Sequence, residues 1–203
     1  MWALFGATGG IGSACYRELL AQGVQVVAFD RSDLDFTDTD AVSSFDLTGY
    51  THVLNCTGTG KGTYLGFVKN DCKNILEQIT VNYTSNLLLL KNFVNTNAQG
   101  HYAWIGSVSS ADNRPYQGVY GSTKLATTFA TKLIAKEVTD LTITEVKLGL
   151  TETNFRYKNY LGSRTNAQVA QEYSDAGALD ADYCARLIIA GIRQRLTLIE
   201  ITK

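Results

Sequence analysis

The sequence predicts an α/β fold in which a doubly wound parallel sheet carries helices on both of its faces. Two observations support this expectation. The chain opens with an apolar run, a glycine-rich turn and a helix-like segment, followed by a second apolar run, within a unit of about 30 residues. Beyond that unit, strand-like and helix-like segments continue to alternate almost to the last residue. This alternation is typical of a parallel sheet whose strands are joined by crossover helices.

The first half of the chain is expected to contribute three strands. They are apolar or rich in β-branched residues and cover residues 2–5, 24–29 and 52–56. A helix closed by Gly23 follows the first strand, and a short polar helix with Thr37 or Asp38 as its N-cap follows the second. Residues 70–94 have helical periodicity and should contain a long helix.

The second half continues the pattern with three more strands, at residues 101–105, 141–148 and 196–201. The helices between them are expected at residues 120–137 and 181–193, and Asp180 should cap the second of these. No linker or internal repeat interrupts the alternation, so the 203 residues are expected to form one domain.

The segment from Asn154 to Gly177 breaks this rhythm because it is long, polar and aromatic. It follows the end of a strand, where α/β sheets carry their ligands. We therefore expect either a mobile cover over a substrate or a packed pair of surface helices, since long connections in compact domains tend to be functional. Its cations Arg156, Lys158 and Arg164 can attract an anionic group, but solvated surface charge is the preferred interpretation.

The composition excludes several classes of protein. A net charge of −1, from 18 basic and 19 acidic residues without long charged runs, argues against a nucleic-acid partner or an acidic membrane surface. The apolar run at residues 87–90 is far too short to span a membrane, and we expect no signal peptide because the first strand-like run begins at Trp2. Four scattered cysteines and two histidines predict no metal site, and free thiols fit a cytoplasmic protein.

Glycines recur in the turn after the first strand at two spacings, and both suit a dinucleotide-binding loop. One spacing uses Gly6, Gly10 and Gly12, and the other uses Gly6, Gly9 and Gly12. Such a loop can turn tightly and approach a pyrophosphate, which would rest against the N-terminus of the helix that begins near Ile11. In its strand, turn and helix context, the loop predicts a Rossmann-like site for NAD or NADP.

Asp30 and Arg31 favour different cofactors. Asp30 ends the second strand, where a carboxylate can accept hydrogen bonds from both hydroxyls of an adenosine ribose. That carboxylate would repel the 2′-phosphate of NADP, whereas the Arg31 guanidinium could bind it. Because Asp30 holds the discriminating position, NAD is favoured and NADP stays the alternative.

Ser107, Tyr120 and Lys124 are candidate catalytic residues. Tyr120 and Lys124 would lie one turn apart on the same face of a helix. An ammonium beside a phenol favours the phenolate, so we expect the pKa of Tyr120 to fall below its ordinary value of about 10, which would let the phenol exchange protons near neutral pH. Ser107, on the preceding loop, can hold a substrate oxygen against this phenol, with Ser109 and Ser110 as nearby rivals.

Together these motifs resemble the single-domain members of the short-chain dehydrogenase/reductase (SDR) family. The family's TGxxxGxG pattern corresponds to FGATGGIG at residues 5–12, with Phe5 in place of the threonine. Its serine, tyrosine and lysine correspond to Ser107, Tyr120 and Lys124, at the family's spacing. Further cofactor-binding positions correspond to the acidic residue after the second strand, the adenine-pocket pair and the NNAG motif: Asp30, Asp35, Phe36, Asn55 and Gly58.

The resemblance also implies roles for further residues. Asn82 corresponds to the catalytic asparagine, which holds a water molecule in a proton relay, and Thr153 to the threonine that bonds the nicotinamide carboxamide. Lys124 would lower the pKa of Tyr120 and bond the nicotinamide ribose. In the implied reaction, hydride passes between the nicotinamide and the carbon of a carbonyl or secondary alcohol, while Tyr120 gives or takes the proton of the oxygen. The dimer helices of the family further imply a homodimer or homotetramer.

Two alternatives to this oxidoreductase stay open. A sugar-nucleotide-modifying SDR is compatible with the second glycine spacing, although the chain is too short for a separate substrate domain. A non-catalytic sensor or scaffold would bind the dinucleotide without turnover, and the complete set of Asn82, Ser107, Tyr120 and Lys124 counts against it. The sequence indicates a small-molecule substrate but does not identify it.

Overall fold

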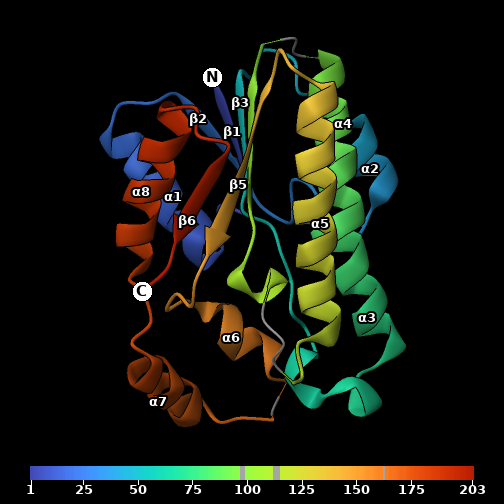
Figure 1. Cartoon of the computed structure of the whole chain (residues 1–203), viewed down its shortest axis with the longest axis vertical. Helices are drawn as coiled ribbons and strands as arrows, with labels where there is room; N and C mark the ends of the chain where they lie inside the picture. The colour runs from blue at the N-terminus through green and yellow to red at the C-terminus, as the bar shows by residue number, and fades with distance from the viewer. Residues whose placement is uncertain (97–98, 112–114, 162) are drawn as a thin grey trace.

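The computed structural model describes residues 1–96, 99–111, 115–161 and 163–203. A six-stranded sheet with the order β2-β1-β3-β4-β5-β6 lies at its centre, and neighbouring strands are parallel throughout. The strands are β1 (Trp2–Phe5), β2 (Val26–Phe29), β3 (His52–Asn55), β4 (His101–Ile105), β5 (Thr142–Leu148) and β6 (Leu198–Ile201). The predicted doubly wound α/β fold is confirmed, because the chain runs from β1 to one edge of the sheet and from β3 to the other (Figure 1).

Helices cover both faces of this sheet, and two more lie beyond the ends of its strands (Figure 1). One face carries α1 (Gly10–Ala21) and α8 (Ala181–Arg193). The opposite face carries α2 (Thr39–Ser44), α3 (Cys72–Ile79), α4 (Ser85–Thr96) and α5 (Gly118–Glu137). The two helices below the sheet in this view are α6 (Asn154–Asn159) and α7 (Asn166–Ala176).

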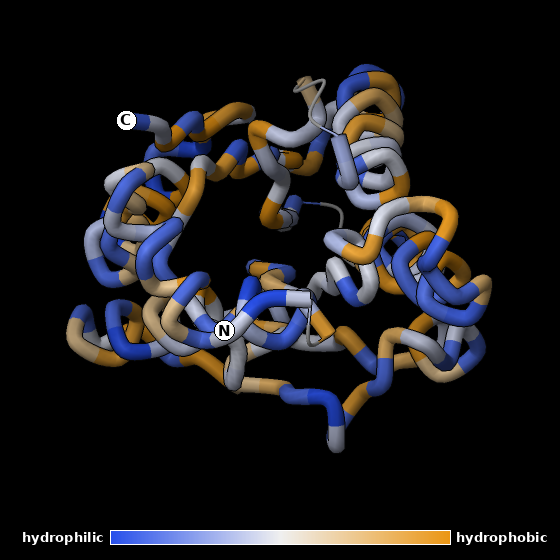
Figure 2. Tube along the Cα trace, turned by 90° about the horizontal axis from the view of Figure 1, so that it is seen from below, coloured by the Kyte–Doolittle hydropathy of each residue, from blue (hydrophilic) through white to orange (hydrophobic). Residues whose placement is uncertain are grey.

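Each face of the sheet has its own apolar core, because successive side chains of a strand point to opposite faces. In β4, Ala103 joins the cluster under α1 and α8, whereas Tyr102 and Trp104 join the cluster under α4 and α5. The helices carry hydrophobic and hydrophilic segments in alternation along their turns (Figure 2), as expected for helices that cover a core with one side. The two cores fix the strand ends from which the site is built.

The long helix expected within residues 70–94 is interrupted. A single π-helical turn, Thr80–Thr84, separates α3 from α4. A π-turn inserts a residue into an otherwise regular helix and often lies at a functional site. Apolar periodicity does not reveal such an insertion, which here contains Asn82.

The segment 154–177 forms a packed pair of helices, and its role as a substrate-covering segment stays a prediction; residue 162 within it lies outside the described residues. The Thr153 side chain caps α6, and a capping box of Thr165 and Gln168 begins α7. Tyr160, Val169 and Tyr173 of this pair form a small apolar cluster separate from the two cores of the sheet. The predicted mobility of the segment stays a prediction.

Candidate functional site

A cavity of about 300 Å³ opens at the ends of β1 and β3. These neighbouring strands continue to opposite edges of the sheet, so the cavity lies at the topological switch point where α/β sheets hold ligands. Its wall combines the loop after β1, the loop after β3, the start of α5 and the start of α6. Among the residues predicted for the site, those in the wall are Gly10, Ile11, Gly58, Ser107, Tyr120, Lys124 and Thr153.

The loop after β1 requires glycine for steric reasons. Gly6 has a φ of 74°, and a Cβ added to Gly12 would lie 2.1 Å from the Gly6 carbonyl oxygen. A Cβ on Gly10 would lie 2.4 Å from the Cβ of Thr153, so the loop also packs closely against the start of α6. The helix α1 begins at Gly10, and no side chain caps its first N–H groups. Such uncapped N–H groups beside a cavity fit the pyrophosphate of a dinucleotide.

Tyr120 and Lys124 lie one turn apart on α5, as the sequence predicts, and Ser107 follows β4. The Ser107 hydroxyl lies close enough to Tyr120 to lower the pKa of its phenol, while the Lys124 ammonium donates a bond of 2.8 Å to the Ile105 carbonyl. Of the rival serines, Ser110 bonds back to the Ser107 carbonyl. The geometry therefore favours Ser107 as the serine that acts with Tyr120.

The pKa of Tyr120 is raised, which is opposite to the direction expected from its lysine. Burial raises it to about 12, partly opposed by the nearby Ser107 hydroxyl. Burial also lowers the pKa of Lys124 to about 8. The ammonium lies 5.8 Å from the centre of the Tyr120 ring and is directed to a backbone carbonyl, so desolvation of the phenol dominates. In this structure Tyr120 is a protonated phenol at neutral pH.

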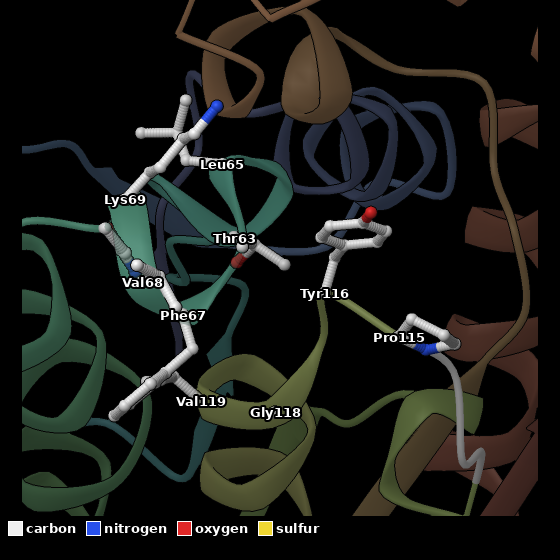
Figure 3. Close-up of a pocket in the computed structure, with 11 residues that line it drawn as sticks. Thr63, Leu65, Phe67, Val68, Lys69, Pro115, Tyr116, Gly118 and Val119 are labelled. Atoms are coloured by element: carbon white, nitrogen blue, oxygen red, sulfur yellow. The ribbon is translucent and has the colours of Figure 1, made fainter.

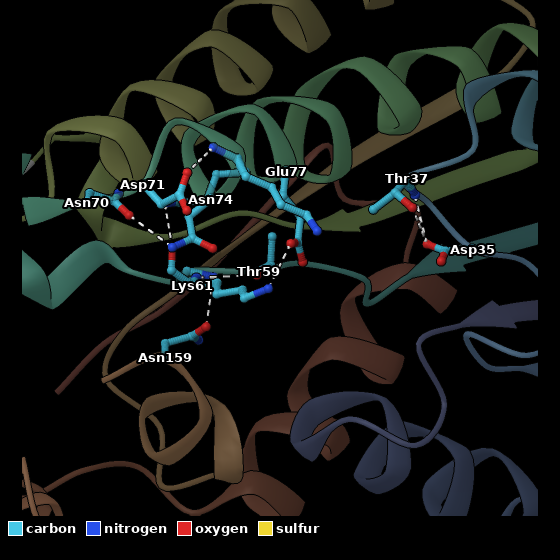
Figure 4. Close-up of polar contacts among 12 residues, drawn as sticks. Asp35, Thr37, Thr59, Lys61, Asn70, Asp71, Asn74, Glu77 and Asn159 are labelled. Carbon is cyan, nitrogen blue, oxygen red and sulfur yellow. Dashed lines mark hydrogen bonds and ion pairs between the residues drawn. The ribbon is translucent and has the colours of Figure 1, made fainter. Parts of the chain in front are cut away.

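Asn82 lies behind the cavity wall, where its side chain fixes the loop after β3. Its amide oxygen accepts a bond from the Thr59 N–H, and its amide nitrogen donates to the Thr59 carbonyl, both at 2.8 Å. The same loop is held by Asn159, which accepts a bond from the Gly60 N–H, and by an ion pair of 3.1 Å between Lys61 and Glu77 (Figure 4). Asn82 thus shapes the wall beside Lys124, and its part in a proton relay stays a prediction.

The residues predicted for the adenosine end lie apart from this cavity. Asp30 accepts bonds from the N–H and hydroxyl of Ser32, which hold the pKa of its carboxyl below its ordinary value. Arg31 directs its guanidinium to Asp35 at 3.1 Å, and Asp35 also accepts bonds from Thr37 (Figure 4). A 2′-phosphate would have to compete with Asp35 for Arg31.

Two predicted cofactor residues turn their side chains into the protein. Phe36 is 5% exposed and packs edge-on against Phe5 in the core, so its side chain faces away from any adenine pocket. Asn55 donates a bond of 2.8 Å to the Asn86 side chain and accepts two bonds from Thr57. Both side chains support the strand ends, and at these positions any cofactor contact would fall to the backbone.

Comparison with known sequences identifies the family. The model of the short chain dehydrogenase family matches residues 41–162, which is more than half of the chain. The chain belongs to the short-chain dehydrogenase family. A search of curated protein sequences finds no significant match.

Solved structures of several dehydrogenases have the same fold. A serine dehydrogenase in its closed form with NADP⁺ superimposes with a TM-score of 0.85 at 17% identity, over 98% of this chain and 93% of that one. The ligand-free aldohexose dehydrogenase of Thermoplasma acidophilum gives 0.84 at 18% identity, over 98% and 91%. A short-chain dehydrogenase/reductase from Burkholderia phymatum in complex with NAD gives 0.76 at 17% identity, over 98% and 87%.

The helix pair α6 and α7 supplies one wall of this short-chain dehydrogenase's cavity. Arg156, expected to be a solvated surface charge, is only 15% exposed and forms an ion pair of 3.1 Å with Glu172, so that interpretation is wrong for this residue. Its guanidinium also lies against the rings of Tyr64 and Tyr173. Arg164 pairs with Glu172 too but is 47% exposed. The sequence does not reveal tertiary contacts, so it could not show that Arg156 lies against two aromatic rings.

The sequence analysis missed several residues of the cavity wall. Cys56, Tyr64, Gln117 and Phe155 all line it. The Gln117 side-chain oxygen is buried and, within the described part of the chain, has no hydrogen-bond partner. Gln117 lies three residues before Tyr120, and this proximity in sequence was the available signal. Cys56 lies between the predicted Asn55 and Gly58, Tyr64 lies in the segment between β3 and α3, and Phe155 lies on α6.

A second cavity, of about 560 Å³, adjoins the first and shares Thr63 with it. One side of it consists of Leu65, Phe67 and Val68, from the segment between β3 and α3 (Figure 3). The opposite side, which includes Tyr116 and Val119, comes from the approach to α5 and its first turn. The lining is mostly apolar, although Phe67 is 77% and Val68 is 95% exposed.

The outer face of α5 carries an apolar stripe of Leu125, Phe129 and Leu133, spaced one turn apart and exposed. Leu76 of the neighbouring α3 is exposed as well. Such a stripe is typical of a surface that a second copy of the chain covers. The homodimer or homotetramer stays a prediction, which a solution mass from light scattering would check.

No helix in residues 1–96, 99–111, 115–161 and 163–203 is both long and apolar enough to cross a membrane. In the same ranges, no three residues of the metal-binding types His, Cys, Asp and Glu come together as a metal site would require.

Proposed function

We propose that this protein is an NAD(P)-dependent oxidoreductase that interconverts a carbonyl compound and its secondary alcohol, with Tyr120 as the general acid and base. The observation that carries the proposal is the meeting of Ser107, Tyr120 and Lys124 in the wall of one cavity that the glycine loop also lines. The family supports the reaction class. A binding protein without turnover would have no chemical use for this arrangement.

In the reducing direction, Ser107 and Tyr120 hold the carbonyl oxygen of the substrate between their hydroxyl groups. Tyr120 donates its proton to that oxygen as negative charge develops on it. The ammonium of Lys124 then stabilises the phenolate that remains. Because the phenol is protonated at neutral pH, it is ready to act as an acid. A bound nicotinamide dinucleotide supplies the hydride in this direction and accepts it in the other.

The glycine loop and the N-terminus of α1 suit the pyrophosphate of such a cofactor, and Asp30 suits its adenosine ribose. We favour NAD because Arg31 is bound to Asp35 at 3.1 Å and is thereby drawn away from a 2′-phosphate. The similar structures include complexes with NADP⁺ and with NAD. Their cofactors therefore do not decide the preference.

The experiment that tests the function is a screen of aldehydes, ketones and 3-oxoacyl thioesters for oxidation of NADH or NADPH. We expect turnover with at least one carbonyl class and a lower KM for NADH than for NADPH. A lower KM for NADPH would contradict the cofactor preference alone. Tight NADH binding without turnover of any substrate would instead support the sensor or scaffold.

The adjoining cavity suggests the shape of the substrate. Its walls are largely carbon, and it meets the catalytic cavity at Thr63. Tyr116 on its rim has a φ of 71°, an uncommon conformation for a large residue, and its ring packs over Gly66. Strained residues of this kind cluster at ligand sites. We therefore propose that the substrate carries an apolar arm that occupies this second cavity.

Ketones with progressively longer alkyl arms test this part of the proposal. We expect kcat/KM to rise by up to about fourfold for each methylene that becomes buried, the factor that hydrophobic transfer provides. Ketones with an oligoether arm of equal length are the matched control and should gain much less. Equal gains in the two series, or none in either, would show that the arm does not enter an apolar cavity.

A further inference from the structure

A buried carboxylate lies beneath the catalytic helix. Glu145 of β5 is 4% exposed, although acidic side chains are almost never fully buried unless they are paired. It is in register with Trp104 of β4 and points to the same face of the sheet as Ile143, two residues earlier, which packs in the core under α4 and α5. The carboxylate therefore lies between the sheet and α5.

The contacts of Glu145 bring it to the anchor point of Lys124. Its Oε1 accepts a hydrogen bond of 2.5 Å from the Thr128 hydroxyl, one helical turn after Lys124 on α5. The same oxygen would lie 2.8 Å from a Cβ on Gly106. Gly106 directly follows Ile105, whose carbonyl accepts the bond from the Lys124 ammonium at 2.8 Å. The carboxylate therefore lies beside Gly106 and the ammonium beside Ile105, two consecutive residues at the end of β4.

Few charged groups face Lys124, which is itself only 4% exposed. Its own helix contributes the Tyr120 phenol, β3 is followed by the Cys56 thiol, and β4 contributes the Trp104 ring at 5.7 Å. Burial raises the pKa of Tyr120, and the neighbouring Cys15 thiol together with burial raises the pKa of Cys56, so both groups are neutral at pH 7. Glu145 is the carboxylate among the groups that act on the Lys124 ammonium.

We propose that Glu145 is a positioning residue that acts through Lys124, as the buried counter-charge that keeps this lysine an ammonium at the Ile105 carbonyl. A lysine in a dry site tends to lose its proton, and an opposite charge nearby opposes that loss. The importance of this charge for turnover rests on the proposed function. The electrostatic effect of Glu145 on Lys124 does not depend on that function.

The sign of the effect follows from the two influences on Lys124. Burial lowers the pKa of Lys124 to about 8, and the carboxylate of Glu145 acts in the opposite direction. Removing that charge leaves burial with less opposition, so the pKa of Lys124 falls further. The ammonium is then lost at a lower pH, and the phenolate of Tyr120 loses its neighbouring positive charge over the same range.

Glu145→Gln tests the proposal because it removes the charge and keeps the shape and an oxygen that can accept from Thr128. The titration of Lys124 is followed by NMR of protein labelled with ¹³C at the lysine Cε, with Lys124→Met used to assign the signal. We expect the midpoint in the variant to fall by on the order of one pH unit. Glu145→Met, which replaces the carboxylate by an apolar side chain of similar length, should lower it as well if the Gln variant folds poorly. An unchanged midpoint in either folded variant would overturn the proposal.

Two further variants separate charge from structure. Glu145→Asp keeps a carboxylate and should titrate closer to the wild type than Glu145→Gln does. Glu200→Gln removes an exposed carboxylate from the neighbouring strand β6, where it pairs with Lys147 at 3.6 Å, and should leave the Lys124 midpoint unchanged. With an active substrate, the alkaline fall of carbonyl reduction should move to lower pH in Glu145→Gln and not in Glu200→Gln. Absence of turnover would count against the proposed function and leave the NMR result intact.

Discussion

Replacing Tyr120 by phenylalanine is expected to reduce kcat by at least about 10², the usual scale for loss of a general acid. The substitution removes the phenol hydroxyl and leaves the ring, whose centre lies 5.7 Å from that of the Phe155 ring. The cavity should therefore keep its shape. Affinity for NADH should change little, because the loss falls on proton transfer.

The measurement compares kcat with NADH affinity from fluorescence titration, in the wild type and the variant. Tyr183→Phe is a matched control, since Tyr183 lies on α8 across the sheet and is 45% exposed. It should retain wild-type values of both quantities. A Tyr120→Phe protein with wild-type turnover would refute the assignment of Tyr120 as the acid.

The arrangement of this site could be predicted from the sequence where one helix sets the geometry. Tyr120 and Lys124 share a face of α5 because residues four apart on a helix are neighbours. Their electrostatics could not be predicted in the same way. The pKa of Tyr120 depends on burial by segments distant in sequence, such as the helix that carries Phe155. The lysine four residues away therefore did not predict the direction in which the pKa of Tyr120 is shifted.

The same limit applies to the cofactor positions. Gly6 and Gly12 could be predicted because the close approach between them is local and excludes any side chain. The positions of Asn55 and Phe36 in a motif did not reveal that the first would bond to Asn86 and the second would enter the core. Motif position specifies the backbone, whereas tertiary packing decides where a side chain goes.

Strands and most helices were predictable because the two apolar cores impose their periodicity on the sequence. The π-turn at residues 80–84 was not, since one inserted residue hardly changes the apolar pattern. The turn includes Asn82, whose side chain bonds to the Thr59 backbone and lies beside the wall of the candidate cavity.

Gly12→Ala is expected to have the second large effect, on dinucleotide binding and on stability together. The new methyl group would lie 2.1 Å from the Gly6 carbonyl oxygen and 2.8 Å from the Gly6 carbonyl carbon. Both are backbone atoms, so the loop itself must move away from the N-terminus of α1. Overpacking of this kind costs about 1–3 kcal/mol in the free energy of unfolding, which corresponds to a melting temperature lower by roughly 2–10 °C for a chain of this size.

NADH affinity should fall at least tenfold in the same variant, because the displaced loop can no longer present its N–H groups to a pyrophosphate. Fluorescence titration and thermal melting measure the two effects. Gly118→Ala is the matched control, since nothing lies within 4 Å of a Cβ at that position, and it should retain both NADH affinity and thermal stability. If Gly12→Ala bound NADH as the wild type does, the loop after β1 would not be the pyrophosphate site, whatever its effect on the melting temperature.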